Sequence, residues 1–92
     1  MSELKETYHP NAYLENIRNT KLGLKARTKI LDSLDKVSGD AKTVGKGAGM
    51  HYGVVMHHLK LLETEDIVLR KSGKPYVWAL TGKGQRRLAV ST

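Results

Sequence analysis

The apolar residues of this chain recur at helical spacing over its first two thirds and form β-type runs after that. A helix is predicted over residues 24–37, because its apolar positions fall on one face: Ile30, Leu31, Leu34 and Val37. The same periodicity predicts a helix over residues 50–64 that buries Val55, Leu59 and Leu62. Between the two, Asp40 is expected to cap a short helix over residues 41–48.

The glycines of the middle segment change this picture. Gly45, Gly47 and Gly49 would each weaken a helix by roughly 1 kcal/mol relative to alanine. The helix over residues 41–48 is therefore expected to be irregular or mobile, and to become ordered only on a partner.

Both ends of the chain carry weaker patterns. Residues 1–9 are polar and aperiodic and are expected to form a flexible arm. A helix is expected over residues 10–20, because proline at position 10 suits a first turn, with Gly23 as a break before the next helix. Thr81 is expected to cap a last helix over residues 82–90.

Two β-prone runs lie between these helices, over residues 67–71 and 75–80. Ser72, Gly73 and Lys74 join them in a turn where glycine can supply a positive φ, so the runs predict a hairpin. The predicted fold is α+β, mainly α: a winged helix-turn-helix with a three-helix core, a two-stranded β-hairpin wing and flanking N- and C-terminal helices. Residues 10–92 form it as a single domain.

The net charge indicates what kind of partner this fold binds. The chain has 92 residues, enough for one modest core, and a formal net charge of +7 at pH 7. Residues 41–62 and 67–92 contain no acid at all, so the two stretches form a positive face if they fold side by side. Such a face favours a polyanionic partner, double-stranded DNA first, although surface lysines also serve solubility alone.

Several classes of protein are disfavoured. The chain has no cysteine, which excludes disulfides, thiolate zinc sites and thiol redox centres. No apolar run is long enough to span a bilayer, and the first residues lack the apolar core of a secretion signal. We expect a cytoplasmic, nucleoid-associated protein with no membrane contact.

Two segments carry a resemblance to a known family. The run His57-His58-Leu59-Lys60-Leu61-Leu62-Glu63-Thr64-Glu65-Asp66-Ile67-Val68 resembles the end of the recognition helix and the turn into the wing in repressors of the arsenical-resistance-repressor (ArsR) type. The run Tyr76-Val77-Trp78-Ala79-Leu80-Thr81-Gly82-Lys83-Gly84 is similar to their second wing strand and its exit. The resemblance covers about residues 24–88. Without cysteine, however, it does not extend to the thiolate metal sensing of many such repressors.

The resemblance implies a transcriptional regulator, a repressor, that inserts the helix over residues 50–64 into the major groove and sets the wing over residues 67–80 on the flanking backbone or minor groove. Base contacts are expected from His51, Tyr52, Val54 and His57. Phosphate contacts are expected from Lys42, Lys46 and Lys60, and wing contacts from Arg70, Lys71 and Lys74. As alternatives, Tyr52 caps the edge of the core, His58 is a packing residue, and Trp78 packs across the hairpin.

A homodimer is the second structural hypothesis. The apolar residues Tyr13, Leu14 and Ile17 form a stripe that a small core does not obviously absorb, and Leu88 is expected to join them. Two subunits about a two-fold axis would present their recognition helices to successive major grooves, so the operator would be an inverted repeat.

Other functions stand as alternatives to that of a DNA-binding regulator. A metal site built on His51, His57 and His58 has too few convergent ligands, and no nucleophile and base pair is recognisable, so we expect no metal, no cofactor and no enzymatic activity. No small-molecule effector is evident. The rivals are a sequence-nonspecific, chromatin-type DNA-binding protein and a winged helix used as a protein-interaction module.

Overall fold

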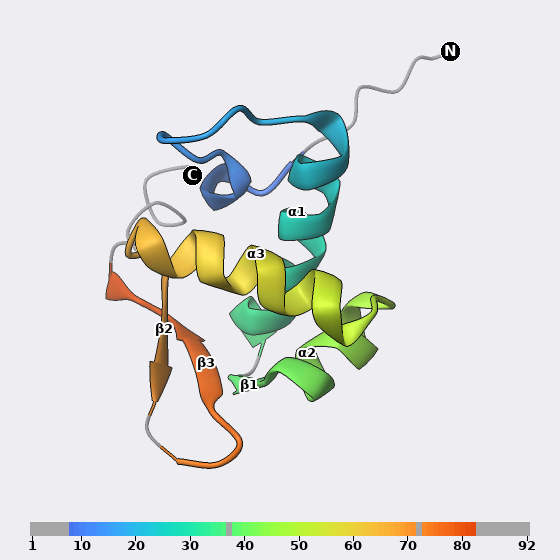
Figure 1. Cartoon of the computed structure of the whole chain (residues 1–92), viewed down its shortest axis with the longest axis vertical. Helices are drawn as coiled ribbons and strands as arrows, with labels where there is room; N and C mark the ends of the chain where they lie inside the picture. Colours follow the sequence, from blue (N-terminus) through green and yellow to red (C-terminus); the bar gives the residue numbers. More distant parts are fainter. Residues whose placement is uncertain (1–7, 37, 72, 83–92) are drawn as a thin grey trace.

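The computed structural model describes residues 8–36, 38–71 and 73–82. Figure 1 shows α3 crossing the middle of the molecule, with α1 passing behind it and the wing extending below. The elements follow in the order η1 (Pro10–Ala12), α1 (Lys21–Lys36), β1 (Gly39–Asp40), α2 (Ala41–Ala48), α3 (Tyr52–Thr64), β2 (Val68–Lys71) and β3 (Val77–Leu80).

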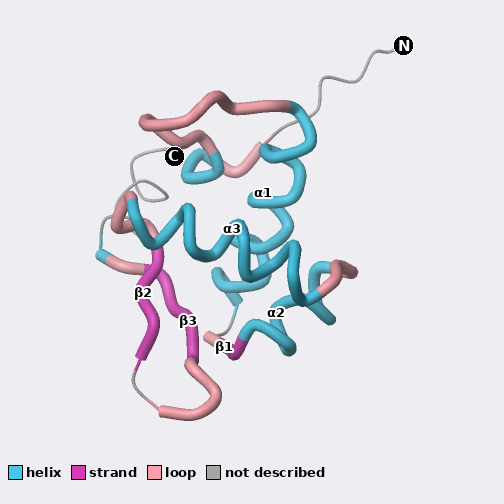
Figure 2. Tube along the Cα trace, in the orientation of Figure 1, coloured by secondary structure: helices cyan, strands magenta, loops and turns pink. Residues whose placement is uncertain are grey.

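The wing is part of a three-stranded antiparallel sheet in the order β1-β3-β2 (Figure 2). The predicted hairpin is confirmed, with Arg70 opposite Trp78 and Lys71 opposite Val77. The third strand, β1, pairs Gly39 with Trp78. It was not predicted, because two residues carry no alternating pattern. β1 lies between α1 and α2 along the chain and pairs with β3, so it connects the helical core to the wing.

Side chains from all three helices and the sheet meet in one core. Ile30, Leu31, Val55, Leu59 and Leu62 are completely buried, as their spacing predicts. Trp78 is 1% exposed and fills the space between the sheet and the helices. It therefore packs as a core residue, in keeping with the alternative weighed for it. Three core-packed helices with a β-hairpin wing confirm the predicted fold class.

The first core helix begins three residues before the predicted start, and Gly23 lies inside it. The reason is a cap at Thr20. Its hydroxyl accepts a hydrogen bond from Gly23 N at 3.1 Å, and its carbonyl accepts one from Leu24 N at 2.9 Å. A Cβ at Gly23 would lie 2.9 Å from Nη1 of Arg27, so a larger residue here would displace the end of that side chain. The prediction that Gly23 is a break was wrong.

The helix predicted over residues 10–20 is also absent. Only a single 3₁₀ turn forms, at Pro10–Ala12. The backbone donors that a helix would use bind side chains instead: Leu14 N donates to Oδ1 of Asn19 at 2.8 Å, and Glu15 N and Asn16 N donate to the carboxylate of Glu65 at 2.8 and 3.1 Å. Tertiary hydrogen bonds thus replace the helical ones in this segment.

Arg27 also binds the segment between Ala12 and Asn19. Arginine is almost never fully buried unless it is paired, yet Arg27 is only 2% exposed. Its Nε donates to the carbonyl of Ala12 at 2.7 Å, its Nη2 donates to Asn19 at 3.0 Å, and its Nη1 lies 3.4 Å from Nδ1 of His58. Burial lowers the pKa of Arg27, and the nearby Glu65 carboxylate opposes that effect.

The glycine-rich segment forms a regular eight-residue helix, α2, so the expectation of an irregular helix was wrong. Asp40 caps it as predicted, accepting from Thr43 N at 2.8 Å. Hydrogen bonding with Thr43, first with its side chain and then with its backbone, lowers the pKa of the Asp40 carboxyl. Gly45 has a packing role that offsets its low helix propensity. A Cβ at this position would lie 3.0 Å from the carbonyl oxygen of Met50 and 3.2 Å from Cγ2 of Val55, so glycine lets α2 and α3 approach closely.

The remaining predicted elements fall partly or wholly outside the described residues. The arm is described only from Tyr8, and the predicted end of the first core helix at Val37 is not described. The helix predicted over residues 82–90 lies outside apart from Gly82, and so does Leu88. Thr81, expected to cap that helix, donates its hydroxyl to the carbonyl oxygens of Asp66 and Ile67.

Candidate nucleic-acid interface

The exposed face of α3 is the centre of the candidate site. Val55 and Leu59 point into the core, whereas residues half a turn away are exposed. Tyr52 is 60% exposed and Val54 is 44% exposed, and His57 and Lys60 follow on the outer side of the helix. An α-helix presented in this way fits the width of a DNA major groove.

The turn that presents α3 is short and well hydrogen-bonded. Gly49 ends α2 in the left-handed conformation with φ 68°, which glycine adopts without strain. Met50 N then donates to the carbonyl of Gly45 at 2.9 Å, and Val55 N donates to the carbonyl of His51 at 3.0 Å. His51 begins α3 without a capping bond from its side chain, so its exposed ring is not engaged in capping.

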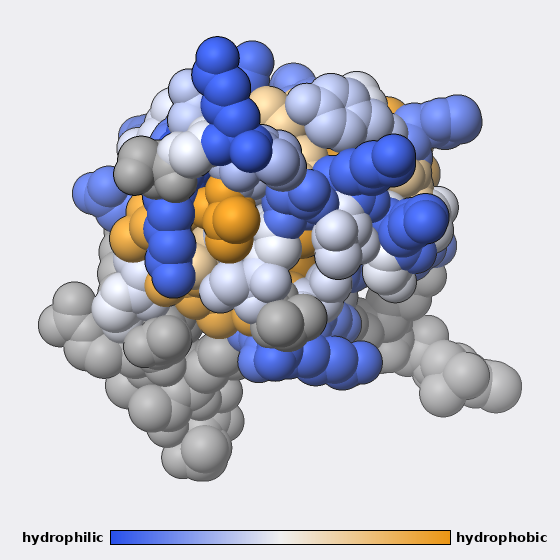
Figure 3. Space-filling view, turned by 90° about the horizontal axis from the view of Figure 1, so that it is seen from below, coloured by the Kyte–Doolittle hydropathy of each residue, from blue (hydrophilic) through white to orange (hydrophobic). Residues whose placement is uncertain are grey.

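Exposed lysines lie on this helix and on neighbouring elements: Lys42 and Lys46 on α2, Lys60 on α3 and Lys74 in the wing turn, whereas Lys71 at the end of β2 lines a separate hollow with Asp35 and Leu69. None of them forms an ion pair with another side chain in the described part of the protein. Seen from the wing side, hydrophilic side chains project from the surface and hydrophobic ones lie between them (Figure 3). Of these lysines, Lys42 lies near the start of α3, because Lys42 and Tyr52 line the same hollow.

A hollow of about 270 Å³ lies between the start of α3 and the wing. Its lining is mostly apolar and aromatic, with Asp40 and Lys42 as the two charged members. The lining residues are Asp40, Ala41, Lys42, Tyr52, Met56, Pro75, Tyr76 and Trp78. Pro75 and Tyr76 are exposed wing residues that were not selected from the sequence. Their position beside Tyr52 depends on how the wing folds back toward α3, which no local pattern reveals.

Arg70 differs from the lysines because its guanidinium already has partners. Its Nε and Nη2 donate to the two carboxylate oxygens of Glu63 at 3.0 and 2.8 Å. The same guanidinium lies over the rings of Trp78 and Tyr76, at 5.0 and 5.1 Å from their centroids. The hydrogen bonds from Arg70 lower the pKa of Glu63, and Glu63 in turn raises the pKa of Arg70.

The comparisons with known proteins agree with this geometry. The chain is similar to the solved Zalpha domain from Carassius auratus PKZ in complex with Z-DNA, at 33% sequence identity and a TM-score of 0.57, over 62% of this chain and 92% of that one. The chain belongs to the winged-helix family that includes this Zalpha domain. No family model matches the chain, and no curated protein does.

A second solved structure shares the winged-helix fold. It is a MarR family transcriptional regulator from Silicibacter pomeroyi DSS, with a TM-score of 0.65 and 20% identity. The match covers 71% of this chain but only 45% of the regulator, so it supports the fold alone. Neither structure is of the ArsR type, and the finer family assignment remains a prediction.

His58 stays out of the exposed face of this winged-helix domain. It is 9% exposed and lies against Arg27, as the packing alternative predicted. Burial, with smaller contributions from the charges of Arg27 and His57, lowers the pKa of His58 to about 4. The ring is therefore neutral near pH 7 and contributes no positive charge to the site. Its neighbour His57 is exposed, and the two rings meet edge to face with centroids 5.0 Å apart.

The predicted dimerisation residues are separated by the fold. Leu14 is 4% exposed and belongs to the core of its own subunit, so assigning it to a dimer interface was wrong. Tyr13 and Ile17 are 46% and 39% exposed. They lie in the segment at the opposite end of the molecule from the wing turn and α2 (Figures 1 and 2).

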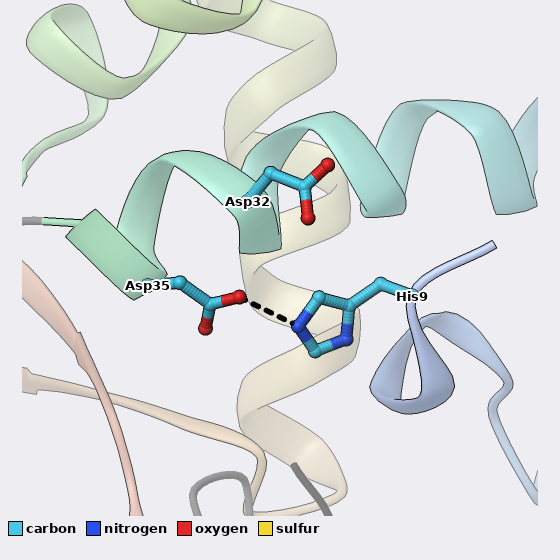
Figure 4. Close-up of side chains that lie close together, drawn as sticks. All are labelled: His9, Asp32 and Asp35. Carbon is cyan, nitrogen blue, oxygen red and sulfur yellow. Dashed lines mark hydrogen bonds and ion pairs between the residues drawn. The ribbon is translucent and has the colours of Figure 1, made fainter. Parts of the chain in front are cut away.

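One group of possible metal ligands occurs among the described residues: His9, Asp32 and Asp35, whose ligand atoms lie within 4.8 Å of one another (Figure 4). Hydrogen bonds account for the position of His9 and its contact with Asp35. Nδ1 of His9 accepts from Asn11 N at 3.1 Å, so the proton is on Nε2, which donates to Asp35 at 2.9 Å. A metal on Nε2 would require a proton on Nδ1, where the Asn11 N–H already points.

The described helices of the winged-helix domain include none that is both long enough and apolar enough to cross a membrane.

Proposed function

We propose that this winged-helix domain binds double-stranded DNA as the DNA-binding part of a transcriptional regulator. In this proposal α3 enters the major groove and the wing rests on the flanking backbone or minor groove. The observation that carries it is the exposed face of α3, which has no acid from Tyr52 to Leu62, carries the exposed Lys60 and has the exposed Lys42 beside Tyr52 at its start. The similarity to a domain solved with Z-DNA supports nucleic-acid binding in general.

The side chains divide by the chemistry they offer. Lys42, Lys46 and Lys60 suit phosphate oxygens, which determine register and affinity but not sequence. The wing contributes Lys74 at its turn and Lys71 at the end of β2. Each phosphate that such a lysine neutralises adds about 0.9 to the slope of log affinity against log salt.

Sequence preference would come from the first two turns of α3. His51 and Tyr52 offer hydrogen-bonding groups to base edges, Val54 offers a methyl contact to thymine, and His57 lies one turn further on. All four side chains are exposed, and each direct base contact is worth roughly 1–3 kcal/mol of discrimination. A role as a repressor of the ArsR type, acting as a homodimer on an inverted repeat, is the finer form of the proposal.

The test is binding of the purified protein to a pool of random duplexes, followed by sequencing of the bound fraction and titration of the best site. A regulator should prefer its selected site to random duplex by about 10³-fold or more. Retention of all sequences alike would identify a chromatin-type protein, and absence of binding at moderate salt would leave the protein-interaction module.

Variants separate the two kinds of contact. His57→Ala should reduce the preference for the selected site by roughly 1–3 kcal/mol while leaving binding to random duplex nearly unchanged. Lys60→Ala should weaken binding to both duplexes equally and lower the salt slope by about 0.9. Equal losses on both duplexes for His57→Ala would make His57 a backbone contact.

A second candidate function follows from the similarity to the Zalpha domain, whose structure contains Z-DNA. Recognition of the left-handed form by shape would make the protein a conformation-specific binder. Titration of a self-complementary alternating dC-dG duplex, followed by circular dichroism, distinguishes the two functions. Inversion of the spectrum at low salt supports the second candidate, and an unchanged right-handed spectrum on binding supports the first.

A further inference from the structure

Arg70 lies among the residues of the candidate interface, yet its surroundings differ from those of every lysine there. It is located within β2 and not at the wing turn, and its cross-strand neighbour is the buried Trp78. Two of its nitrogens are hydrogen-bonded to Glu63 in the last turn of α3. A phosphate would have to compete with this carboxylate and with the two aromatic rings for the same guanidinium.

The contacts connect three parts of the site. Glu63 is on the recognition helix, Arg70 on the second strand of the sheet, and Trp78 and Tyr76 on or beside the third. Paired donation to both oxygens of one carboxylate gives directional as well as electrostatic specificity, and stacking on the rings fixes the guanidinium plane. The side chains of Arg70 and Glu63 are only 34% and 31% exposed.

We propose that Arg70 is a positioning residue that fixes the wing at one angle to the recognition helix through Glu63 and the rings of Trp78 and Tyr76, and that it is not a phosphate contact. This rests on the proposed DNA-binding function. In this arrangement the DNA phosphates near the wing are contacted by the wing lysines and not by Arg70. Glu63 at the end of α3 favours DNA binding although it carries the same charge as DNA.

A substitution whose expected effect on DNA affinity is opposite to the usual one tests the proposal. Removing a negative charge from a DNA-binding face ordinarily strengthens binding. Glu63→Gln should instead weaken binding, because it releases Arg70. Asp66→Asn is the matched control: Asp66 lies three residues further on, is exposed, and forms no ion pair with a described side chain. Glu63→Gln should bind duplex about three- to tenfold more weakly than Asp66→Asn.

The conservative variant adds a second criterion. Arg70→Lys keeps the charge but loses the paired hydrogen bonds and the stacking, whereas lysine replaces arginine well at a simple phosphate contact. We expect Arg70→Lys to weaken binding as much as Glu63→Gln, with the salt slope unchanged. Lys74→Ala should lower that slope by about 0.9. Tighter binding by Glu63→Gln than by Asp66→Asn, or wild-type affinity of Arg70→Lys, would overturn the proposal.

Trp78 reports on the coupling without DNA. It is the one tryptophan of the chain, and the guanidinium lies 5.0 Å from its ring. Both Glu63→Gln and Arg70→Lys should change its emission and increase its quenching by acrylamide, whereas Asp66→Asn should not. Unchanged emission in both variants would refute the coupling. If the emission changes but no variant, nor the natural protein, binds duplex, the proposed function fails while the positioning role stands.

Discussion

Gly45 provides the strongest test of how α2 and α3 pack against each other. A Cβ at this position would lie 3.0 Å from the backbone oxygen of Met50, which cannot rotate away, and 3.2 Å from Cγ2 of the fully buried Val55. Gly45→Ala therefore forces α2 and α3 apart. Overpacking of this kind costs about 1–3 kcal/mol, while alanine recovers about 1 kcal/mol of helix propensity. The expected net change is a loss of up to about 2 kcal/mol.

Gly47 is the matched control, because it lies two residues further along the same helix. A Cβ there would meet only the side chain of Ser33, at 3.1 Å from its Oγ, and that hydroxyl can rotate. Gly47→Ala should therefore stabilise the protein by up to about 1 kcal/mol. Both variants gain nearly the same helix propensity from alanine, so the difference in their stability measures the cost of the close approach of α2 and α3 at Gly45.

Thermal unfolding followed by circular dichroism measures this difference. For a domain of this size, 1 kcal/mol corresponds to about 4–8 °C in Tm. The Tm of Gly45→Ala should lie roughly 5–20 °C below that of Gly47→Ala. If the two variants show the same Tm, Gly45 does not control the packing of α3 against α2, and the packing role assigned to this glycine is wrong.

Three further predictions follow from the buried polar groups and the exposed N-terminal segment. Because burial lowers the folded pKa of His58 to about 4, the unfolded chain binds more protons than the native state between that value and the ordinary pKa of about 6.5. The free energy of unfolding should therefore fall by up to about 3 kcal/mol as the pH drops through this window. His58→Gln should flatten the profile of Tm against pH. An equally steep profile in the variant would show that groups other than His58 cause the pH dependence of stability. Arg27→Met should destabilise the protein by about 3 kcal/mol or more in urea titrations, because it leaves the buried Ala12 carbonyl without its arginine donor and removes one of the two donors to Oδ1 of Asn19, whereas Lys29→Met on the exposed side of the same helix should change little. Sedimentation at micromolar concentration should show a dimer that Tyr13→Ser and Ile17→Ser weaken, and a single 10.2 kDa species would remove the dimer hypothesis.

The periodicity of the core predicted most of the fold. Leu31, Val55 and Leu59 are buried as their spacing requires, and the wing strands pair as the turn at Gly73 predicted. Helical and β-type periodicity succeed here because each reports the burial of one face, and burial is what holds these elements together.

The failures share a different cause, which is hydrogen bonding between distant segments. The backbone of residues 13–16 is bound by Asn19 and Glu65 instead of forming a helix, and Arg27 is buried because three acceptors surround it. Such partners are separated by up to 50 residues. Local pattern cannot identify them, because any carboxylate or arginine in the chain could serve.

The candidate site was predictable as a set of exposed residues but not as an arrangement. The exposed positions of α3 follow from its buried ones, so His57 and Lys60 were found. The pairing of Arg70 with Glu63 was not, because those residues are seven apart and belong to a helix and a strand whose relative position only the folded chain defines.

Amide chemical shifts of the labelled protein, recorded during titration with a selected duplex, test the central claim most directly. If α3 and the wing form the DNA-binding face, the largest shifts will fall on residues 51–60 and on the wing lysines Lys71 and Lys74, while residues 13–17 at the opposite end of the molecule will stay unchanged. Shifts concentrated on residues 13–17, or none on α3, would contradict it.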